Sequence, residues 1–512
     1  MNHMVTFSVY EALQHAHALL TAGKHHEAWQ AALRVLDASP DEPMAYVIAA
    51  VAGGAGQGPA YQVKVLEEAR GRISADPLIL YNLALSHQQC GDTLLAVLRY
   101  RDALRVTPQA HDARWNLAEL LRLNGSFSEA IDHLKVLLDA GIECESIFHR
   151  IGVCYAGIGE YEESIRYFVR ELRSPSNRAV TMWELSHVLL KTGRFEEGWA
   201  AYDYRFSAPE VINVSRQKYP FAQWAGYSLR NSSILIHGEQ GLGDEIMFSS
   251  TFPELIAQAS HVTIACHPAL SDLFARSFPR ARVVPHVAGG SPFCARGTEY
   301  DYQISMGSIP RYTRRTADAY NQVVHPYLDA DPVACNRFEQ EIRQRMPRTN
   351  SAVRIGVAWA SRAGIAGSRT AIRSYEKSLP VRYLEMLADV PGITFISLQT
   401  ADAAAEAALA PRLDIVDFSS RLVTLADTAA LISRLNLVIT IDTCVAHLAC
   451  ALGKPTWILL KRDCDWRWGT AGSETPWYPS ARLFRQTVSG EWTAVMCEVR
   501  SALTGIVAQA QP

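Results

Sequence analysis

Glycines recur at a fixed spacing in the first two hundred residues, and this spacing limits the fold of the chain more than any other feature. Gly91, Gly125, Gly159 and Gly193 lie 34 residues apart, and Gly23 precedes Gly91 by two such periods. A small residue follows each of these glycines by five positions, and most repeats carry a larger residue four positions beyond it. The small residues are Ala28, Ala96, Ala130, Ser164 and Gly198, and the larger ones are Leu66, Tyr100, Leu134, Phe168 and Tyr202. A period of 34 is typical of a helix–turn–helix unit that buries its apolar face only by stacking on its neighbours.

The pattern resembles the tetratricopeptide repeat, in which the glycine lies at the turn between two helices. About six units fit between residues 9 and 207, and the second is degenerate because Gln57 occupies the glycine position. The resemblance implies an all-α solenoid over residues 1–207 with a concave groove that binds peptides or other proteins. The repeat indicates a binding surface and no reaction.

Length and composition indicate a chain of two or three domains, with 512 residues of which 48% are hydrophobic and 20% charged. The net charge of −3 gives no electrostatic reason to expect nucleic acid as a partner. No run approaches the ~18–20 apolar residues that cross a bilayer, and the amino terminus lacks the features of a secretory signal. The ten cysteines form no CxxC pair, and several lie in apolar segments. We therefore expect a cytoplasmic protein with reduced thiols, no nucleic-acid partner and no membrane span.

From about Ser232 the sequence alternates short apolar runs with helical segments. The runs are ILIHGE, VTIACH, ARVVPH and YDYQIS, and after a connector they are RIGVAWA, ITFISLQ, DIVDF, LVITID and TWILL. This alternation favours parallel sheets covered by helices on both faces. Two such series predict two Rossmann-like domains facing a cleft, with ligands at the carboxyl ends of the strands. The predicted boundaries are a connector at 208–230, a first domain at 231–330, a linker at 331–350 and a second domain at 351–512.

A glycine-rich turn follows the first of these strands, in the segment SSILIHGEQGLGDEIMFSS from Ser232 to Ser250. The turn carries Gly241 and Gly243, but it is neither GxGxxG nor a P-loop, which would need a following Lys-Ser or Lys-Thr. Asp244 comes directly after the glycines and would repel a phosphate. The local pattern alone therefore favours Asp244 as an ordinary acid at a helix N-terminus, where carboxylates are stabilised.

A second segment with polar residues at a strand end is VITIDTCVAHLACALGKPTWILL, residues 438–460. A strand delivers Asp442 and Thr443 to its carboxyl end, and a helix with His447 near its start follows at once. The first amides of that helix are expected to form an anion site: Cys444, Val445 and Ala446. The alternative is that Asp442 is a plain helix cap and His447 a packed core histidine.

A third segment, RSYEKSLPVRYLEML, places basic residues before a helix that begins after a proline. Lys377 and Ser378 precede the proline, and Arg373 lies four residues before Lys377. Because basic groups at a helix start oppose the helix dipole, they suggest an external anion. A solvated surface cluster is the alternative.

Two further patterns carry less weight. Asp329-Ala-Asp331 and Asp463-Cys-Asp465 match the DxD pattern of metal-dependent sugar transfer, but three-residue matches are common by chance and no cluster of metal ligands supports them. The segment from Asp463 to Gln486 combines three tryptophans and a tyrosine with arginines. That density suits stacking on a base or sugar ring, and an ordinary packed loop is equally compatible with it.

Taken together, these segments resemble the heptosyltransferase-type glycosyltransferases of family 9. The resemblance is carried by Gly241-Leu242-Gly243-Asp244, Lys377-Ser378-Leu379-Pro380 and Asp442-Thr443-x-x-Ala446-His447-Leu448-Ala449. The whole chain is similar to bacterial proteins in which tetratricopeptide repeats precede such a domain, with GEQGLGDE, FISLQ, ADTAALI, DTCVAHLACALGKP, DWRW and PWYPSARLFRQ in that order. The implied fold is GT-B, with two Rossmann-like domains and the donor nucleotide held mainly by the second. No metal and no cofactor other than the donor substrate are implied.

The resemblance also implies roles for individual residues. Asp244 faces the acceptor as general base, while the amides of residues 444–446, with Lys377 and Arg373, stabilise the departing nucleoside diphosphate. Asp442, Thr443 and His447 hold sugar hydroxyls or phosphate. The remaining residues expected at the donor are Gly241, Gly243, Ser378 and Gln399.

The expected function is an inverting, metal-independent glycosyltransferase that moves a sugar from a nucleotide-diphosphate sugar to a protein recruited by the repeats. One segment departs from the relatives, since this chain carries ASRAGIAGSRTAIRSYE between Trp359 and Lys377. An adaptor protein with a degenerate, non-catalytic transferase domain is therefore the alternative. A transferase acting on lipid-linked or polysaccharide acceptors is a third option, and a homo-oligomer is compatible with the sequence.

Overall fold

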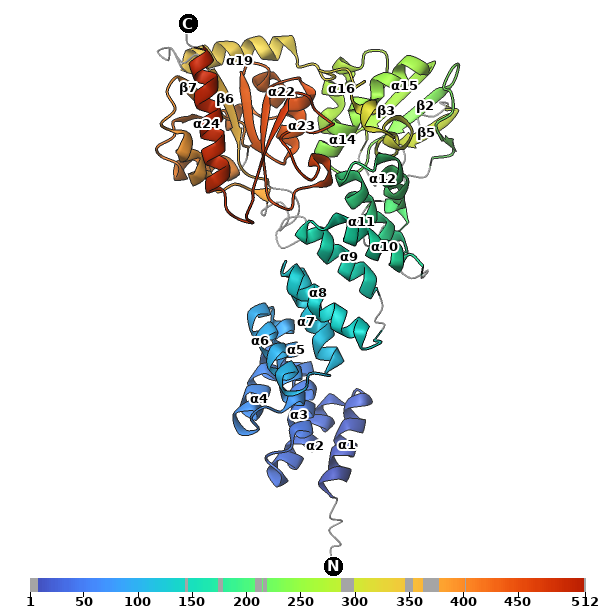
Figure 1. Ribbon diagram of the computed structural model, residues 1–512, viewed down its shortest axis with the longest axis vertical. Helices are drawn as coiled ribbons and strands as arrows, with labels where there is room; N and C mark the ends of the chain where they lie inside the picture. Colours follow the sequence, from blue (N-terminus) through green and yellow to red (C-terminus); the bar gives the residue numbers. More distant parts are fainter. Residues whose placement is uncertain are drawn as a thin grey trace, which may run out of the picture. The chain divides into compact units, whose positions relative to one another are not determined.

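The computed structural model describes residues 8–142, 146–173, 178–207, 214, 219–286, 299–345, 353–361, 377–400 and 402–510. The chain divides into two compact units, Met1–Ser176 and Asn177–Pro512. The first unit is a helical repeat array, and the second contains two parallel sheets covered by helices (Figure 1). The fold class predicted from the sequence, a repeat array followed by an α/β region, is confirmed.

Paired antiparallel helices form the first unit. They are α1 (Val9–Thr21), α2 (His25–Ala38), α3 (Pro43–Gln57), α4 (Pro59–Arg72), α5 (Pro77–Cys90), α6 (Thr93–Val106), α7 (His111–Leu123), α8 (Phe127–Asp139), α9 (Ile147–Ile158) and α10 (Tyr161–Glu171). Gly91 and Gly159 close α5 and α9 with φ of 82° and 90°, a left-handed conformation that suits glycine. Ala96 and Ala130, five residues after the turn glycines, are fully buried between helices.

The last repeat-like helix pair belongs to the second unit. It comprises α11 (Arg178–Lys191) and α12 (Phe195–Tyr202), followed by the 3-10 turn η1 (Asp203–Phe206). Trp199 and Tyr202 of α12 lie in the same hydrophobic core as Phe248 and Trp466 of the α/β region. The Trp199 and Trp466 rings meet edge to face at 5.4 Å.

The first sheet is parallel, with strand order β1-β5-β2-β3-β4. Its strands are β1 (Ala222–Gln223), β2 (Ser233–His237), β3 (His261–Cys266), β4 (Arg282–Pro285) and β5 (Tyr302–Ser305). Along β2 the buried side chains alternate, because Ile234 and Ile236 join one core and Leu235 joins another. The first core is completed by α14 (Leu242–Phe248), α15 (Phe252–Gln258) and α16 (Ser271–Ser277).

The second sheet is also parallel, with strand order β11-β10-β9-β6-β7-β8. Its strands are β6 (Val353–Ala358), β7 (Ile393–Ser397), β8 (Ile415–Val416), β9 (Leu437–Ile441), β10 (Thr456–Leu460) and β11 (Ala481–Arg485). On β9, Val438 packs in the core with α22 (Leu425–Ile432) and α23 (Cys444–Ala451), whereas Ile439 packs in the core with α24 (Thr493–Ala510) (Figure 1). Near-continuous burial of β9 and β10 agrees with a parallel sheet covered on both faces.

The two sheets of the second unit share one hydrophobic core, in which α14 of the first packs against α23 of the second. A helix, α19 (Pro332–Arg345), occupies most of the described part of the predicted linker, and the short β1 lies in the predicted connector. The remaining elements are η2 (Ser249–Thr251), η3 (Pro268–Leu270), η4 (Met306–Ser308), α17 (Pro310–Thr313), α18 (Ala317–Tyr320), η5 (Val381–Leu387), α21 (Asp402–Ala405), η6 (Glu406–Leu409), η7 (Ser419–Arg421) and η8 (Trp466–Trp468).

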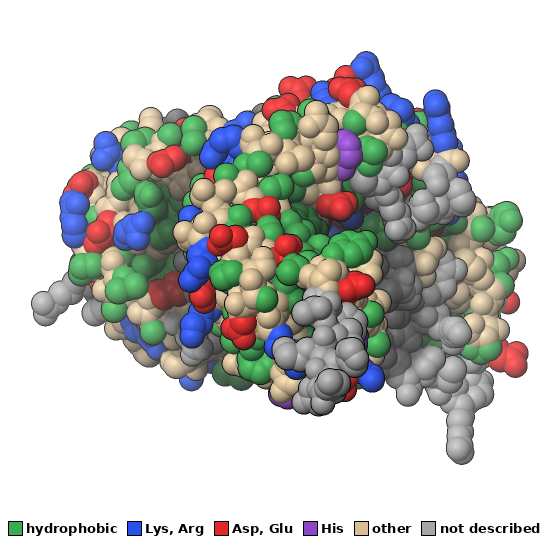
Figure 2. Space-filling view, turned by 90° about the horizontal axis from the view of Figure 1, so that it is seen from below, with side chains coloured by type: hydrophobic (Ala, Val, Ile, Leu, Met, Phe, Trp, Pro, Cys, Tyr) green, Lys and Arg blue, Asp and Glu red, His purple; other side chains and the backbone are tan. Residues whose placement is uncertain are grey.

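Basic and acidic side chains are interspersed with apolar ones on the face shown in Figure 2. None of the helices in the described ranges is long and apolar enough to span a membrane. The eight cysteines that the structure describes are free thiols, and Cys154, Cys266 and Cys450 are buried.

Candidate active site

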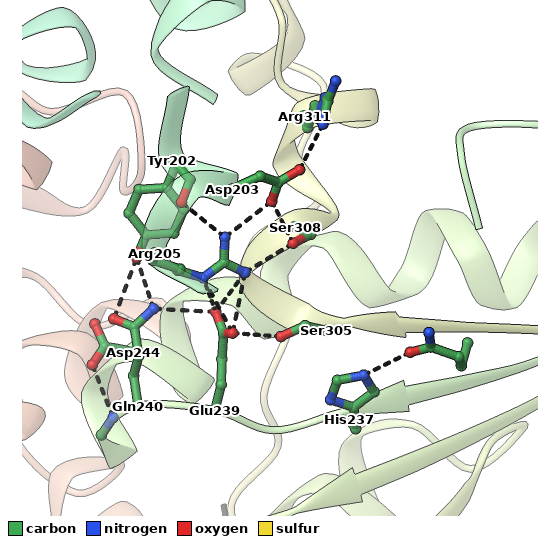
Figure 3. A network of polar contacts seen from close by, with 12 residues as sticks. Tyr202, Asp203, Arg205, His237, Glu239, Gln240, Asp244, Ser305, Ser308 and Arg311 are labelled. Carbon is green, nitrogen blue, oxygen red and sulfur yellow. Dashed lines mark hydrogen bonds and ion pairs between the residues drawn. The ribbon is translucent and has the colours of Figure 1, made fainter. Parts of the chain in front are cut away.

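A buried ion pair supports the glycine-rich turn that follows β2 (Figure 3). Arg205 of η1 donates from Nε to Glu239 Oε1 at 3.0 Å, and Ser305 Oγ donates to Glu239 Oε2 at 2.5 Å. Both charged groups are buried. Burial lowers the pKa of Arg205, but the charges of Glu239 and Asp203 outweigh burial, and the pKa is raised. Because either charge would be costly without its partner, the pair fixes the turn to η1.

Hydrogen bonds extend this support on both sides of the ion pair (Figure 3). Gln240 Nε2 donates to Tyr202 Oη at 2.9 Å, and Arg205 Nη2 donates to Ser308 Oγ at 2.8 Å. A Cβ at Gly307 would overlap Glu239 Oε1, whose position is held by Arg205 and Ser305, so glycine suits this position. The helix pair that precedes the α/β region thus holds the turn in place.

The same helix pair also contacts the loop that carries the DWRW motif. Lys191 at the end of α11 donates from Nζ to Cys464 O at 2.7 Å and to Asp463 Oδ1 at 3.3 Å. Asp465 then begins η8 by accepting from Arg467 N–H at 3.2 Å. Contacts from α11 and η1 therefore position two loops that belong to different sheets.

Asp244 lies in the first turn of α14, and each of its carboxylate oxygens has a different partner. Oδ2 accepts from Gly241 N–H at 3.0 Å, which is a capping contact. Oδ1 accepts from Nη2 of Arg467, and these two side chains form an ion pair. Asp244 is thus an acid at a helix N-terminus, and it also points toward a cation supplied by the second sheet.

A second ion pair links two of the residues expected at the donor. Lys377 Nζ lies 2.7 Å from Asp442 Oδ2. Burial lowers the pKa of Lys377, but the carboxylates of Asp442 and Asp465 outweigh it, so its pKa is raised. Burial raises the pKa of Asp465, but Arg467 and Lys377 bring it well below its usual value. Lys377 and Arg467 are therefore close enough to act on the same carboxylate.

His447 lies between the two sheets, buried at the start of α23. Its Nδ1 is 2.8 Å from Tyr478 Oη, and its ring stacks on Trp468 at 5.3 Å between centroids. A Cβ on Gly243 would lie 3.0 Å from His447 Cδ2, so the glycine permits α14 to approach the imidazole. Burial lowers the pKa of His447 to about 4, and the imidazole is neutral at physiological pH. His447 is a packed core residue that also borders the two ion pairs.

The amides at the start of α23 differ in their availability. Ala446 N–H donates to Thr443 O at 3.0 Å, so it is used inside the turn. Cys444 and Val445 have no backbone partner for N–H within the described part of the chain. Burial and the charge of Asp244 raise the pKa of the Cys444 thiol to about 12, so it stays protonated. Two of the three amides predicted to hold an anion, those of Cys444 and Val445, therefore remain candidates for that role.

The other predicted donor residues occupy different places. Gln399 Oε1 accepts from Trp359 N–H and Ala360 N–H, each at 3.1 Å, and Nε2 donates to Ala360 O, so its amide fixes the backbone after β6. Ser378 Oγ accepts from Ser361 N–H at 3.1 Å. Arg373 lies outside the described residues. The predicted helix after Pro380 is a 3-10 helix, η5.

Four residues of this region were given no role from the sequence: Arg205, Glu239, Asp465 and Arg467. Asp465 was considered only as part of a DxD match and was set aside. For Arg467 the signal was present, because the DWRW motif was recognised as a concentration of aromatic and basic residues. Its partner Asp244 lies 223 residues away in the sequence. Within the described ranges, no group of three or more His, Cys, Asp or Glu side chains could hold a metal ion.

Comparison with known families agrees with this arrangement. Residues 81–143 match the family described as tetratricopeptide repeat, and residues 384–484 match glycosyltransferase family 9 (heptosyltransferase). The second match includes β9, α23 and η8, and thus Asp442, His447 and Arg467. The chain therefore carries tetratricopeptide repeats and, in its C-terminal region, a family 9 glycosyltransferase domain.

A relative that covers most of the chain is Protein FlbA of Caulobacter vibrioides. It is 28% identical over 450 residues, which is 77% of this chain and 72% of the relative. Among solved structures, the crystal structure of MamA protein has a TM-score of 0.30 at 17% identity and covers 34% of this chain and 94% of its own. Pseudomonas aeruginosa PilF has a TM-score of 0.35 at 15% identity and covers 40% of this chain and 93% of its own. The family matches support a role of the glycosyltransferase type.

Proposed function

We propose that the second unit transfers a sugar from a nucleotide-diphosphate sugar to an acceptor hydroxyl, with inversion and without a metal. One observation supports this most strongly: a carboxylate from the first sheet, Asp244, meets the cation of Arg467 from the second sheet, with Lys377 close by. A sugar transfer needs a base for the acceptor and positive charge for the leaving phosphate, and these groups supply both.

In the proposed reaction Asp244 takes the proton of the acceptor hydroxyl as its oxygen attacks the anomeric carbon. The bond from that carbon to the phosphate oxygen breaks, and the electron pair leaves with the nucleoside diphosphate. Lys377 and the amides of Cys444 and Val445 stabilise the charge that develops on the diphosphate. Asp442 and Thr443, at the carboxyl end of β9, bind hydroxyls of the donor sugar.

A protein is the acceptor that the architecture favours. Tetratricopeptide arrays expose the faces of their first helices, and on α5 and α7 the matching positions carry aromatic and amide side chains. Tyr81 and Trp115 are 34 residues apart and only partly buried, as are Asn82 and Asn116. Such side chains suit the binding of an extended peptide, and we propose that the array brings a protein side chain to the transferase.

Binding of nucleoside diphosphates tests the proposed function. The full chain is melted alone and with uridine, guanosine, adenosine or cytidine diphosphate, because a ligand at ~100 times its Kd stabilises the native state by about 2.7 kcal/mol. At least one diphosphate should raise the melting temperature, and the Lys377→Met variant should lose that shift. If no diphosphate shifts the melting temperature, the adaptor function, with a transferase domain that binds no donor, is favoured.

A further inference from the structure

The guanidinium of Arg467 has a pair of donors, Nε and Nη2, of which only Nη2 has a hydrogen-bond partner among the described residues. Its Nη1 donates to Asp465 Oδ1 at 2.6 Å, and its Nη2 donates to Asp244 Oδ1. Its Nε is buried and has no hydrogen-bond partner among the residues that the structure describes. The guanidinium lies over the Trp466 ring at 4.3 Å and is largely buried. Because Nε and Nη2 form a fork that matches two oxygens of a carboxylate or phosphate, the single contact with Asp244 leaves the fork half filled.

Carboxylates outnumber cations among the described ion pairs around His447, and this balance disfavours the binding of a further anion. Among the ion-paired side chains that the structure describes there, two cations, Lys377 and Arg467, face three carboxylates, Asp244, Asp442 and Asp465. A phosphate that binds Arg467 therefore has to replace one of its two carboxylate partners, because an uncompensated negative charge in a buried site is costly.

Of the two carboxylates on Arg467, Asp244 can leave at the lower cost. Asp465 holds Arg467 through Nη1 and also caps η8 through Arg467 N–H. Asp244 makes one contact with Arg467, and its other oxygen remains bound to Gly241 N–H at 3.0 Å. After losing Arg467, the Asp244 side chain would therefore keep its orientation at the start of α14.

We propose that Arg467 exchanges Asp244 for a phosphate of the donor when the nucleotide-diphosphate sugar binds. The Nε and Nη2 atoms then bind two phosphate oxygens, and Asp244 becomes free to accept a proton from the acceptor. This inference rests on the proposed function. It makes Arg467 a donor-binding residue and makes donor binding the step that releases the general base. The donor consequently has to bind before a productive acceptor.

A double-mutant cycle on nucleoside diphosphate binding tests the exchange. Calorimetry on the full chain measures Kd for the diphosphates of uridine, guanosine, adenosine and cytidine with wild type, Asp244→Asn, Arg467→Gln and the double variant. Asp244→Asn removes the competitor and should tighten binding by about threefold to tenfold, since a competing contact lowers the fraction of competent sites. Arg467→Gln should weaken binding by about tenfold or more, because it removes a charge-assisted fork.

The decisive result is the double variant. If Asp244 acts only through Arg467, the double variant should bind like Arg467→Gln, with no tightening from the second change. Equal tightening by Asp244→Asn in both backgrounds would overturn the exchange, because it would show a general electrostatic effect. An unchanged Kd in Arg467→Gln would also overturn it.

Two further controls keep these outcomes distinct. Arg467→Lys retains the charge but lacks the fork, so it should also weaken binding, and it replaces Arg467→Gln if that variant does not fold. Binding of a diphosphate that is insensitive to Arg467 would leave the proposed function standing and refute the exchange. If wild type binds none of the four diphosphates, the proposed function and the exchange both fail.

Discussion

Arg205 and Glu239 form a fully enclosed ion pair that joins the end of the last repeat-like helix pair to the turn that presents Asp244. Arg205 has no exposed surface, and Glu239 is 4% exposed. Two further hydrogen bonds satisfy the pair, because Ser305 Oγ donates to Glu239 and Arg205 donates to Ser308 Oγ. The site therefore depends on a residue that precedes the α/β region in the sequence.

Replacing Arg205 by methionine should destabilise the second unit by about 3–5 kcal/mol, because it leaves the Glu239 carboxylate buried without a partner. The free energy of unfolding in urea measures the effect. Arg311→Ala is the matched control, since its ion pair with Asp203 is partly exposed and should contribute less than about 1 kcal/mol. Equal losses for both variants would contradict the structural role of the buried pair.

The nine apolar runs named from the sequence correspond to strands β2 to β10. The sequence did not predict β11, where Arg482 and Arg485 interrupt the run ARLFR. It also did not predict β1, which has two exposed residues and pairs only with β5. Both strands, β1 and β11, are stabilised by pairing with a neighbouring strand. The alternation of apolar residues within a short segment does not reveal that neighbour, so the sequence did not predict them.

For the site, the sequence placed Asp442 and His447 at a strand end because the strand–helix boundary is local. The partners of these residues were not predictable in the same way. Asp244 and Arg467 come from different sheets, and Lys191 and Arg205 reach the site from α11 and η1. The repeat period locates α11 and α12 correctly, but the aromatic contacts of Trp199 and Tyr202 decide which unit they join.

Gly243→Ala should destabilise the second unit by about 1–3 kcal/mol, because the new methyl group would overpack a rigid contact. The added Cβ would lie 3.0 Å from Cδ2 of His447, whose ring is held by Trp468 and Tyr478. Thermal unfolding measures the loss. Gly505→Ala on α24 meets nothing within 4 Å, so it should be neutral or stabilise by up to about 1 kcal/mol. A neutral Gly243→Ala would contradict the close packing of α14 on His447.

Glu245 gives the second unit a distinct dependence on pH. Burial, with the charges of Asp244 and Glu239, raises its pKa to about 8, and it accepts from His267 N–H at 2.9 Å. In the unfolded chain a glutamate has a pKa of about 4.3. Because the folded state holds the proton more tightly, the contribution of Glu245 to the free energy of unfolding is complete below that pH. It is lost as the pH rises toward and through 8.

Glu245→Gln keeps the hydrogen-bond acceptor and cannot titrate. The unfolding free energy of this variant should therefore fall less at alkaline pH than that of wild type. Between about pH 6 and about pH 9 we expect wild type to lose about 1–3 kcal/mol relative to the variant. Urea unfolding at both pH values provides the measurement, with the exposed Glu498→Gln as control. Parallel losses in wild type and Glu245→Gln would show that Glu245 is ionised when folded.

Lys377→Met should weaken binding of a nucleoside diphosphate by about tenfold to a hundredfold, as expected for loss of a charge-assisted contact. Calorimetric titration with the diphosphate that stabilises wild type measures Kd. Arg382→Met removes an exposed cation five residues away and should leave Kd unchanged. If the two variants bind equally well, Lys377 has no role at the phosphates.

The most direct test of the account is release of nucleoside diphosphate from a nucleotide sugar, compared between wild type and Asp244→Asn. The donor carries the nucleotide that binds, and water serves as the acceptor. We predict that Asp244→Asn retains binding of the diphosphate while release falls by about 10²–10⁴-fold, the usual contribution of a general base. Release at the wild-type rate by Asp244→Asn would contradict the assignment of the base on which the proposed mechanism depends.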